Sequence, residues 1–275
     1  MIQYKPLDST QHRSHGWKRY DHYRFAARDA WAPLLLAEIP AALAVYPFAF
    51  AAMPAGGHRL VVLQGLYEGQ NLLVAPNGKW RVGYVPSHYR GYPFTLQRVV
   101  EAEKQQLVLC FDHDSGLYRE HPNSFNGEQR FFDDSGQPGE LVGRLLKFLK
   151  QTAVNREVTD RAVAGLEQAG LLVDWPLSVE NPDPNRPLLK GLKQVDQGAL
   201  GALGGKALEA LKRTNALPVA YAQIFSTARL GVLIKFAELH AQNAERQGLA
   251  GPEGIESMFP QDGGGFVFDF DEYTK

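Results

Sequence analysis

The stretch from residue 71 to residue 94 reads NLLVAPNGKWRVGYVPSHYRGYPF, and it decides how the first half of the chain folds. Its Asn77-Gly78 pair lies between two apolar runs, which is the strongest short-range sequence signal of a β-hairpin. Both central residues of such a turn need a positive φ, which Asn and Gly adopt at little cost. The pattern therefore predicts a hairpin with the strands Asn71–Ala75 and Trp80–Val85.

Further strands are predicted on both sides of this hairpin. Arg59–Gly65 and Leu107–Phe111 are short apolar runs, and the unbroken run of the second is typical of a buried central strand. Two polar DSG turns, at residues 114–116 and 134–136, end this part of the chain. The residues up to about 137 are therefore predicted to form a β-rich half with mostly antiparallel strands.

The most apolar stretch is Ala30–Ala52, which is long enough to span a bilayer. Glu38 opposes that interpretation, because a charge at the centre of a bilayer costs roughly 2.5–3.5 kcal/mol or more. Three prolines also interrupt any helix in this stretch. It is instead predicted to hold a short buried helix near Leu34–Ala44 and a strand at Tyr46–Phe50, without a membrane span.

From Pro138 onward the apolar residues follow the helical period. Helices are predicted over residues 141–152, 159–169, 197–202, 205–214 and 218–243, the last with an interruption near Gly231. The predicted fold class is therefore α+β, with a β-rich N-terminal half (residues 1–137) packed with a helical C-terminal half (residues 138–250). Because the joining segment is short, both halves are expected to form one domain over about residues 12–240.

Composition excludes several classes of protein. Apolar residues make up 44% of the chain and charged residues 21%, as in ordinary globular proteins. The 29 basic and 30 acidic residues give a net charge of −1, so no bulk field attracts nucleic acid or an anionic membrane. Cys110, the single cysteine, excludes an intrachain disulfide and lies in an apolar run typical of an inert thiol. No secretory signal is evident, so a cytoplasmic location is expected.

The segment Trp80–Phe94 is the best candidate for a binding site. Its two prolines fix a loop that carries aromatic rings and a guanidinium group, which suit a planar or anionic ligand. The alternative is that its first aromatic residues belong to the core and that Arg90 holds a buried carboxylate such as Glu38. The candidate ligand-binding residues of this segment are Trp80, Tyr84, His88, Arg90 and Tyr92.

Asp112-His113-Asp114 forms a second candidate, because it follows a predicted buried strand. A histidine between carboxylates can act as a general base or a metal ligand, and His88 or His121 could complete a set of two histidines and one carboxylate. The alternative is a plain turn. The spacing matches no metal motif, and no nucleotide-binding glycine pattern or nucleophile elbow occurs. No metal and no cofactor are therefore predicted.

The chain resembles the SapC family, named after a bacterial surface-layer operon protein, from about His12 to about Leu239. The most specific piece, residues 78–94, is similar to the family signature G-x-W…Y-[IV]-P…R-x-Y-P-F. Asn215 stands where a glycine is expected, and Phe225 stands where leucine is common. Shorter matching pieces are Ala32-Pro33-Leu34 with Glu38, Tyr46-Pro47-Phe48, Gly65-Leu66, Phe131-Phe132-Asp133 and Ala216-Leu217-Pro218.

The resemblance implies a bacterial protein linked to cell-envelope systems, whose genes often accompany flavin-dependent, halogenase-like proteins. It implies no catalytic residue. Two functions are therefore considered. The first is a soluble, non-enzymatic accessory or binding protein that acts through the Trp80–Phe94 region. The second is an enzyme, or a substrate-delivering partner of a flavin-dependent halogenase-like protein, with a pocket built from that loop and Asp112 and His113.

The end of the chain, residues 251–275, is predicted to be an acidic and aromatic tail behind a glycine hinge at residues 263–265. In an extended strand its phenylalanines share one face and its aspartates the other. Exposed phenylalanines are unfavourable in water, so the tail is expected to dock on its own domain, on a second copy or on a protein partner. The alternative is a disordered tail. The candidate partner-binding residues are Phe266, Phe268, Phe270, Asp269 and Asp271.

Overall fold

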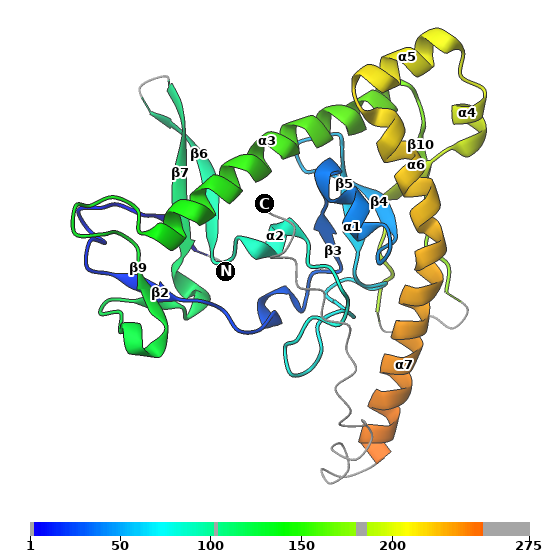
Figure 1. Cartoon of the computed structure of the whole chain (residues 1–275). Coiled ribbons are helices and arrows are strands. Elements are labelled where there is room, and N and C mark those ends of the chain that lie inside the picture. The colour runs from blue at the N-terminus through cyan, green and yellow to red at the C-terminus, as the bar shows by residue number, and fades with distance from the viewer. Residues whose placement is uncertain (1–2, 102–103, 180–185, 250–275) are drawn as a thin grey trace.

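The computed structural model describes residues 3–101, 104–179 and 186–249. It confirms the α+β class, with antiparallel strands mostly in the N-terminal half and helices mostly in the C-terminal half (Figure 1). The strands are β1 Tyr4–Pro6, β2 Gly16–Lys18, β3 Trp31–Pro33, β4 Phe48–Ala52, β5 His58–Leu63, β6 Phe94–Glu101, β7 Lys104–Asp112, β8 Tyr118–Arg119, β9 Glu128–Arg130, β10 Leu172–Asp174 and β11 Leu192–Val195. The helices are α1 Ile39–Ala42, α2 Ser87–Arg90, α3 Glu140–Gln168, α4 Gln197–Gly201, α5 Gly205–Arg213, α6 Ala216–Ser226 and α7 Leu230–Leu249.

Three antiparallel sheets organise the described strands. One has the order β1-β7-β6, one the order β8-β2-β9, and the largest the order β10-β11-β4-β5-β3. In the largest sheet β4 pairs with β5 along its whole length, from Phe48 opposite Val62 to Ala52 opposite His58. The two strands from the helical half, β10 and β11, extend this sheet beside β4.

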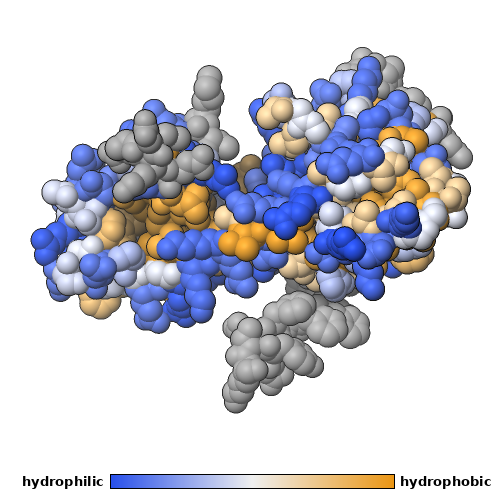
Figure 2. All heavy atoms as spheres, turned by 90° about the horizontal axis from the view of Figure 1, so that it is seen from above, coloured by the Kyte–Doolittle hydropathy of each residue, from blue (hydrophilic) through white to orange (hydrophobic). Residues whose placement is uncertain are grey.

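Two hydrophobic cores hold the molecule together, and α3 belongs to both. The N-terminal part of α3 places Val142 in the smaller core, beside Phe94, Phe111 and Phe131 of the β1-β7-β6 and β8-β2-β9 region. Its C-terminal part places Leu166 in the larger core, which covers the five-stranded sheet and also contains residues of α5, α6 and α7. Figure 1 shows α3 running from the region of the smaller core to the region of the larger core. Figure 2 shows two lobes that are joined by a narrower part of the molecule.

The prediction of two helices over residues 141–152 and 159–169 is wrong, because α3 is one helix of 29 residues. Thr159 is not a cap; it is fully buried inside the helix. Its Oγ1 donates to the backbone oxygen of Asn155 (2.8 Å) and accepts from the backbone N–H of Leu36 (2.9 Å). Its polar group therefore joins α3 to the chain before α1. The predicted glycine cap is correct, with Gly170 at φ 67°.

The prediction of a hairpin around Asn77-Gly78 is half right. A turn forms here, with Gly78 at φ 84° and the N–H of Ala75 donating to the oxygen of Lys79 (2.9 Å), but Asn77 does not have the predicted positive φ. The flanking strands do not form, since Val74 opposite Trp80 is an isolated bridge. The indole of Trp80 donates to the backbone oxygen of Tyr84 (3.0 Å), so the segment from Trp80 to Tyr84 is not an extended strand.

Other predicted elements lie close to the observed ones. The apolar stretch before residue 52 forms a 3-10 turn, α1 and β4, and the run from Arg59 forms β5. The predicted helix over 218–243 is α6 and α7, separated by a 3-10 turn at Thr227–Arg229. The central strand β7 is buried at Phe111 but exposed at Leu107, 47% of whose surface is accessible.

One helical stretch, Ala216–Leu239, is long and apolar enough to cross a membrane by length and composition alone. Core helices of proteins without membrane spans pass the same test. Val219, Ala220 and Ala222 of this stretch lie in the larger hydrophobic core. The finding is therefore weak support for a span.

Candidate functional site

The short helix α2 is held in place by the buried carboxylate of Glu38. This carboxylate accepts hydrogen bonds from the backbone N–H of Ser87 (2.6 Å), the Ser87 hydroxyl (2.7 Å) and the backbone N–H of Leu35 (3.0 Å). The Tyr84 hydroxyl adds a fourth (2.7 Å). Ser87, the first residue of α2, is held through both its backbone N–H and its hydroxyl, so the position of the next residue, His88, is fixed as well.

Arg90 contributes to this support. Its guanidinium lies 3.6 Å from the Glu38 carboxylate and donates to the Tyr84 hydroxyl (3.1 Å). Trp80 and Tyr84 are partly buried against the larger core, and the Trp80 indole also donates to the Tyr46 hydroxyl (3.1 Å). The structure therefore agrees with the alternative in which these three residues build the loop. None of them lines the hollows described next.

His88 lies where three surface hollows meet, of about 520, 840 and 490 Å³. Its side chain is exposed to solvent within the cleft that these three hollows form. Although His88 is accessible to solvent, the protein around its ring displaces part of the bulk water, and this desolvation lowers the pKa of His88. The charge of Arg156 lowers the pKa further, and the charge of Glu38 raises it. The imidazole is therefore neutral at pH 7 and can accept a proton or a hydrogen bond.

Three arginines line the 840 Å³ hollow, and two of them, Arg59 and Arg156, share the carboxylate of Asp160. Arg59 lies 3.3 Å from one oxygen of Asp160, and Arg156 lies 3.9 Å from the other. Arg156 also donates to the backbone oxygen of Leu34 (3.1 Å). Burial and the neighbouring Arg59 lower the pKa of Arg156 to about 10, so it stays charged at pH 7. In the part of the chain that the structure describes, the Nε of Arg59 and the Oδ1 of Asp160 are both buried without a hydrogen-bond partner. Arg98 and Glu157 line the hollow as an ion pair, so three arginines face two carboxylates and the lining carries one excess positive charge.

The 490 Å³ hollow on another side of His88 is acidic. Asp29, Asp112 and Asp114 line it together with Tyr92. Asp112 is buried, and it accepts from the backbone N–H of Asp114 (3.1 Å) and from the Tyr92 hydroxyl (3.4 Å). Burial raises the pKa of Asp29, although the Tyr89 hydroxyl donates to its carboxylate (3.0 Å). The sign of the charge therefore changes across His88.

Of the residues singled out in the sequence, the structure brings together His88, Tyr92 and Asp112. His113 lies apart from this hollow, with its ring centre 4.4 Å from that of Tyr118 and 5.9 Å from that of His12. Within the described ranges, no three His, Cys, Asp or Glu side chains are grouped so that they could hold a metal ion. The set of two histidines and one carboxylate is therefore not formed. Burial raises the pKa of the Cys110 thiol, as expected of an inert cysteine.

The tail candidates Phe266, Phe268, Phe270, Asp269 and Asp271 lie outside the described residues. Arg59, Arg156 and Asp29 were not predicted from the sequence; the fold brings them to one cleft from β5, α3 and the segment before β3. Because these residues lie far apart in the sequence, no local sequence pattern indicates that they meet. A local pattern exists only for Arg156, because the Arg156-x-x-x-Asp160 spacing places both charges on one face of α3.

Comparison with known proteins gives one match. The model of a family described as SapC matches residues 7–233. No curated protein and no solved structure matches the chain. The matched range contains both hydrophobic cores and the residues around His88.

Proposed function

The chain belongs to the SapC family, and from this premise we propose that it is a soluble, non-enzymatic binding protein of a bacterial cell-envelope-related pathway. Its ligand is a small molecule with an anionic group, held in the cleft around His88. The observation that carries this proposal is the pair Arg59 and Arg156, which share the carboxylate of Asp160 in a hollow of about 840 Å³, where the second carboxylate, that of Glu157, is paired with Arg98. The envelope-related pathway is what the family resemblance implies.

The electrostatics of this hollow favour an anion. Arg59 and Arg156 share the carboxylate of Asp160, and Glu157 is paired with Arg98, so one positive charge of the lining is uncompensated. A ligand carboxylate or phosphate can accept guanidinium N–H groups in pairs. Inside a partly enclosed hollow such a contact is stronger than in bulk water. Hydrophobic side chains from β6, β7 and α3 (Leu96, Leu107 and Leu149) line the same hollow, so an anionic group joined to an apolar body fits best.

The acidic hollow orients this ligand. Asp29 and Asp112 repel a second anionic group on their side of His88, so the anionic end points toward β5 and α3. Neutral His88 between the two sides can accept or donate one hydrogen bond to the ligand.

The experiment compares two probes of one shape on the full-length protein by isothermal titration calorimetry. We expect 2-naphthoate to bind at least about tenfold more tightly than its neutral analogue 2-naphthamide, a difference of about 1.4 kcal/mol. Arg156→Gln should remove this preference. Arg161→Gln is the matched control, because Arg161 is an exposed arginine on the same helix, and it should keep the preference. Equal affinities for the two probes, or equal effects of the two substitutions, would refute the proposal.

A second candidate function is an enzyme, or a substrate-delivering partner of a flavin-dependent halogenase-like protein. It is favoured by the meeting of His88, Tyr92 and Asp112 at one hollow, where a neutral imidazole could act as a general base. The test uses small molecules that copurify with the protein and are identified by mass spectrometry. Steady conversion of such a molecule by the purified protein, lost in His88→Gln, would favour the enzyme over the binding protein.

A further inference from the structure

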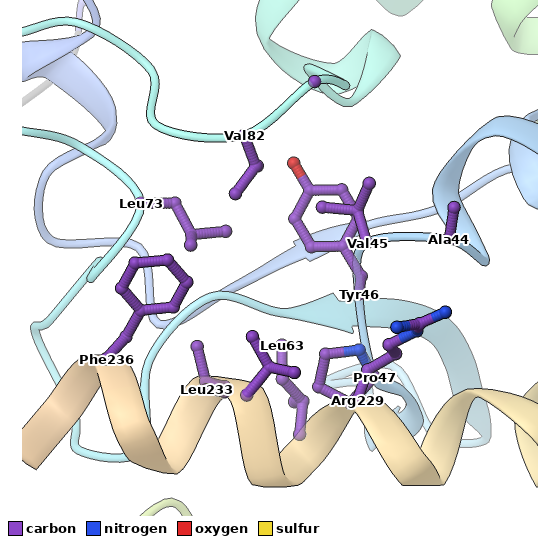
Figure 3. A pocket seen from close by; sticks show the side chains of 12 residues that line it. Ala44, Val45, Tyr46, Pro47, Leu63, Leu73, Val82, Arg229, Leu233 and Phe236 are labelled. Carbon is purple, nitrogen blue, oxygen red and sulfur yellow. The ribbon is translucent and has the colours of Figure 1, made fainter. Parts of the chain in front are cut away.

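A separate apolar hollow of about 280 Å³ lies between α7 and the loops beside the five-stranded sheet. Figure 3 shows Leu233 and Phe236 rising from α7 toward Leu73 and Val82, with Tyr46 beside them. A cavity of about 150 Å³ is enough to hold a benzene ring, so this hollow can take an aromatic side chain.

The guanidinium group of Arg229 lies at the edge of this hollow. Arg229 is exposed and lines the hollow, and among the residues that the structure describes it forms no ion pair. Val232, on the next turn of the chain, is also exposed at 44% of its surface. The hollow is therefore an apolar site with a positive charge at its edge, and within the described residues no carboxylate pairs with this charge.

We propose that this hollow is the docking site of the chain's own tail, residues 266–272, with a phenylalanine in the hollow and an aspartate on Arg229. The sequence FVFDFDE supplies both groups, because in an extended strand Phe266, Phe268 and Phe270 share one face and Asp269 and Asp271 the other. This proposal is independent of the ligand cleft around His88.

The length of the chain allows this docking. Phe236 lies 13 residues before Leu249, the last described residue of α7, which corresponds to about 20 Å along the helix. The 16 residues from 250 to 265 can span up to about 53 Å when extended. The tail can therefore return along α7 to the hollow, and the glycines at 263–265 allow the change of direction.

The first test cross-links the tail to α7 in the full-length protein with a short bis-maleimide. One variant carries Val232→Cys with Val267→Cys, which keeps all three phenylalanines. The matched variant carries Glu238→Cys with Val267→Cys, because Glu238 is exposed, lies about 120° around α7 from Val232 and is nearer to the end of the helix. We expect intramolecular cross-linking at least about tenfold faster at position 232.

A tail that is not docked would reach position 238 at least as fast as position 232, so equal rates or faster reaction at 238 would overturn the proposal. Cross-linked dimers at position 232 would also overturn it, because the occupant would then be the tail of a second copy. Both α7 positions are exposed, so neither cysteine disturbs the core.

The second test reverses the charges. Arg229→Glu should slow cross-linking at position 232 to the rate at position 238, and adding Asp269→Lys with Asp271→Lys should restore the faster rate. A rate that does not respond to Arg229→Glu would refute the contact between the tail and Arg229. Replacing the three phenylalanines with serine should abolish the difference between the two positions, and a persistent difference would refute the apolar part of the docking.

Discussion

The carboxylate of Glu38 accepts both the backbone N–H and the hydroxyl of Ser87, over 2.6 and 2.7 Å. These residues lie 49 positions apart in the chain, and both are buried. Through this contact the turn before α1 fixes the first residue of α2, which places His88 in the cleft. The support for the proposed ligand site is therefore a buried carboxylate that does not itself touch the hollow around His88.

We predict that Glu38→Gln destabilises the protein by about 3 kcal/mol, because the amide nitrogen cannot accept the hydrogen bonds of the oxygen it replaces and Arg90 loses its anionic partner. Urea denaturation followed by circular dichroism measures the change in the free energy of unfolding. Glu157→Gln is the control, since Glu157 forms an exposed ion pair with Arg98, and it should change stability by less than about 1 kcal/mol. Similar losses in both variants would show that Glu38 is not an organising residue.

Thr159 provides a test of the long helix. Thr159→Val keeps the shape but leaves the N–H of Leu36 without its acceptor, which should cost about 1–3 kcal/mol. Thr159→Ser keeps the hydroxyl and loses one methyl group, so it should cost about 1 kcal/mol. Thermal unfolding compares the two variants. If Thr159→Ser were the more damaging, packing of the methyl group and not the hydrogen bond would dominate at this position.

Asn215 is the one non-glycine residue with a positive φ (59°) in the described part of the chain. Side chains with a Cβ atom pay roughly 1–2 kcal/mol in this region, although Asn is tolerated better than most. We therefore expect Asn215→Gly to leave stability unchanged or raise it, and Asn215→Ala to lower it by about 1 kcal/mol. Chemical denaturation of both variants tests this, and a stable Asn215→Ala would contradict the backbone geometry.

The pH dependence of ligand binding should report on His88. Its pKa lies below the ordinary 6.5 because the surrounding protein and Arg156 disfavour the imidazolium. An anionic ligand prefers the charged form, so the affinity for 2-naphthoate should rise as the pH falls through this lowered pKa. His88→Gln should flatten the rise, whereas His121→Gln, at an exposed position outside the cleft, should not. An affinity that falls with acidification would show that the imidazole does not face the anion.

Local patterns predicted local structure well. The Asn77-Gly78 turn, the cap at Gly170 and the short helix before β4 each depend on a few neighbouring residues. The glycine expected at position 215 also has a physical reason, because the backbone there is left-handed. The strands beside Asn77-Gly78 do not form beyond the bridge between Val74 and Trp80, and the Trp80 indole is instead tied to Tyr46 and Tyr84.

The candidate site was predicted only where one segment supplies it. His88 and Tyr92 come from the Trp80–Phe94 loop, and the sequence placed them together. Arg59 and Arg156 come from a strand and a helix about 100 residues apart, and only the packing of α3 against β5 brings them to one carboxylate. The sequence pattern predicts two separate helices in place of α3, so it does not predict that Arg156 lies beside Arg59.

The most direct test of the proposed ligand site is the position of a bound anion. Crystals of the full-length protein with 6-bromo-2-naphthoate would locate the probe through the anomalous signal of bromine. We predict one bound molecule in the cleft, with its carboxylate within hydrogen-bond distance of the Arg59 or Arg156 guanidinium and its rings toward Leu149. A probe bound only elsewhere, for example beside Arg229, or an empty cleft at saturating concentration, would contradict the proposed function.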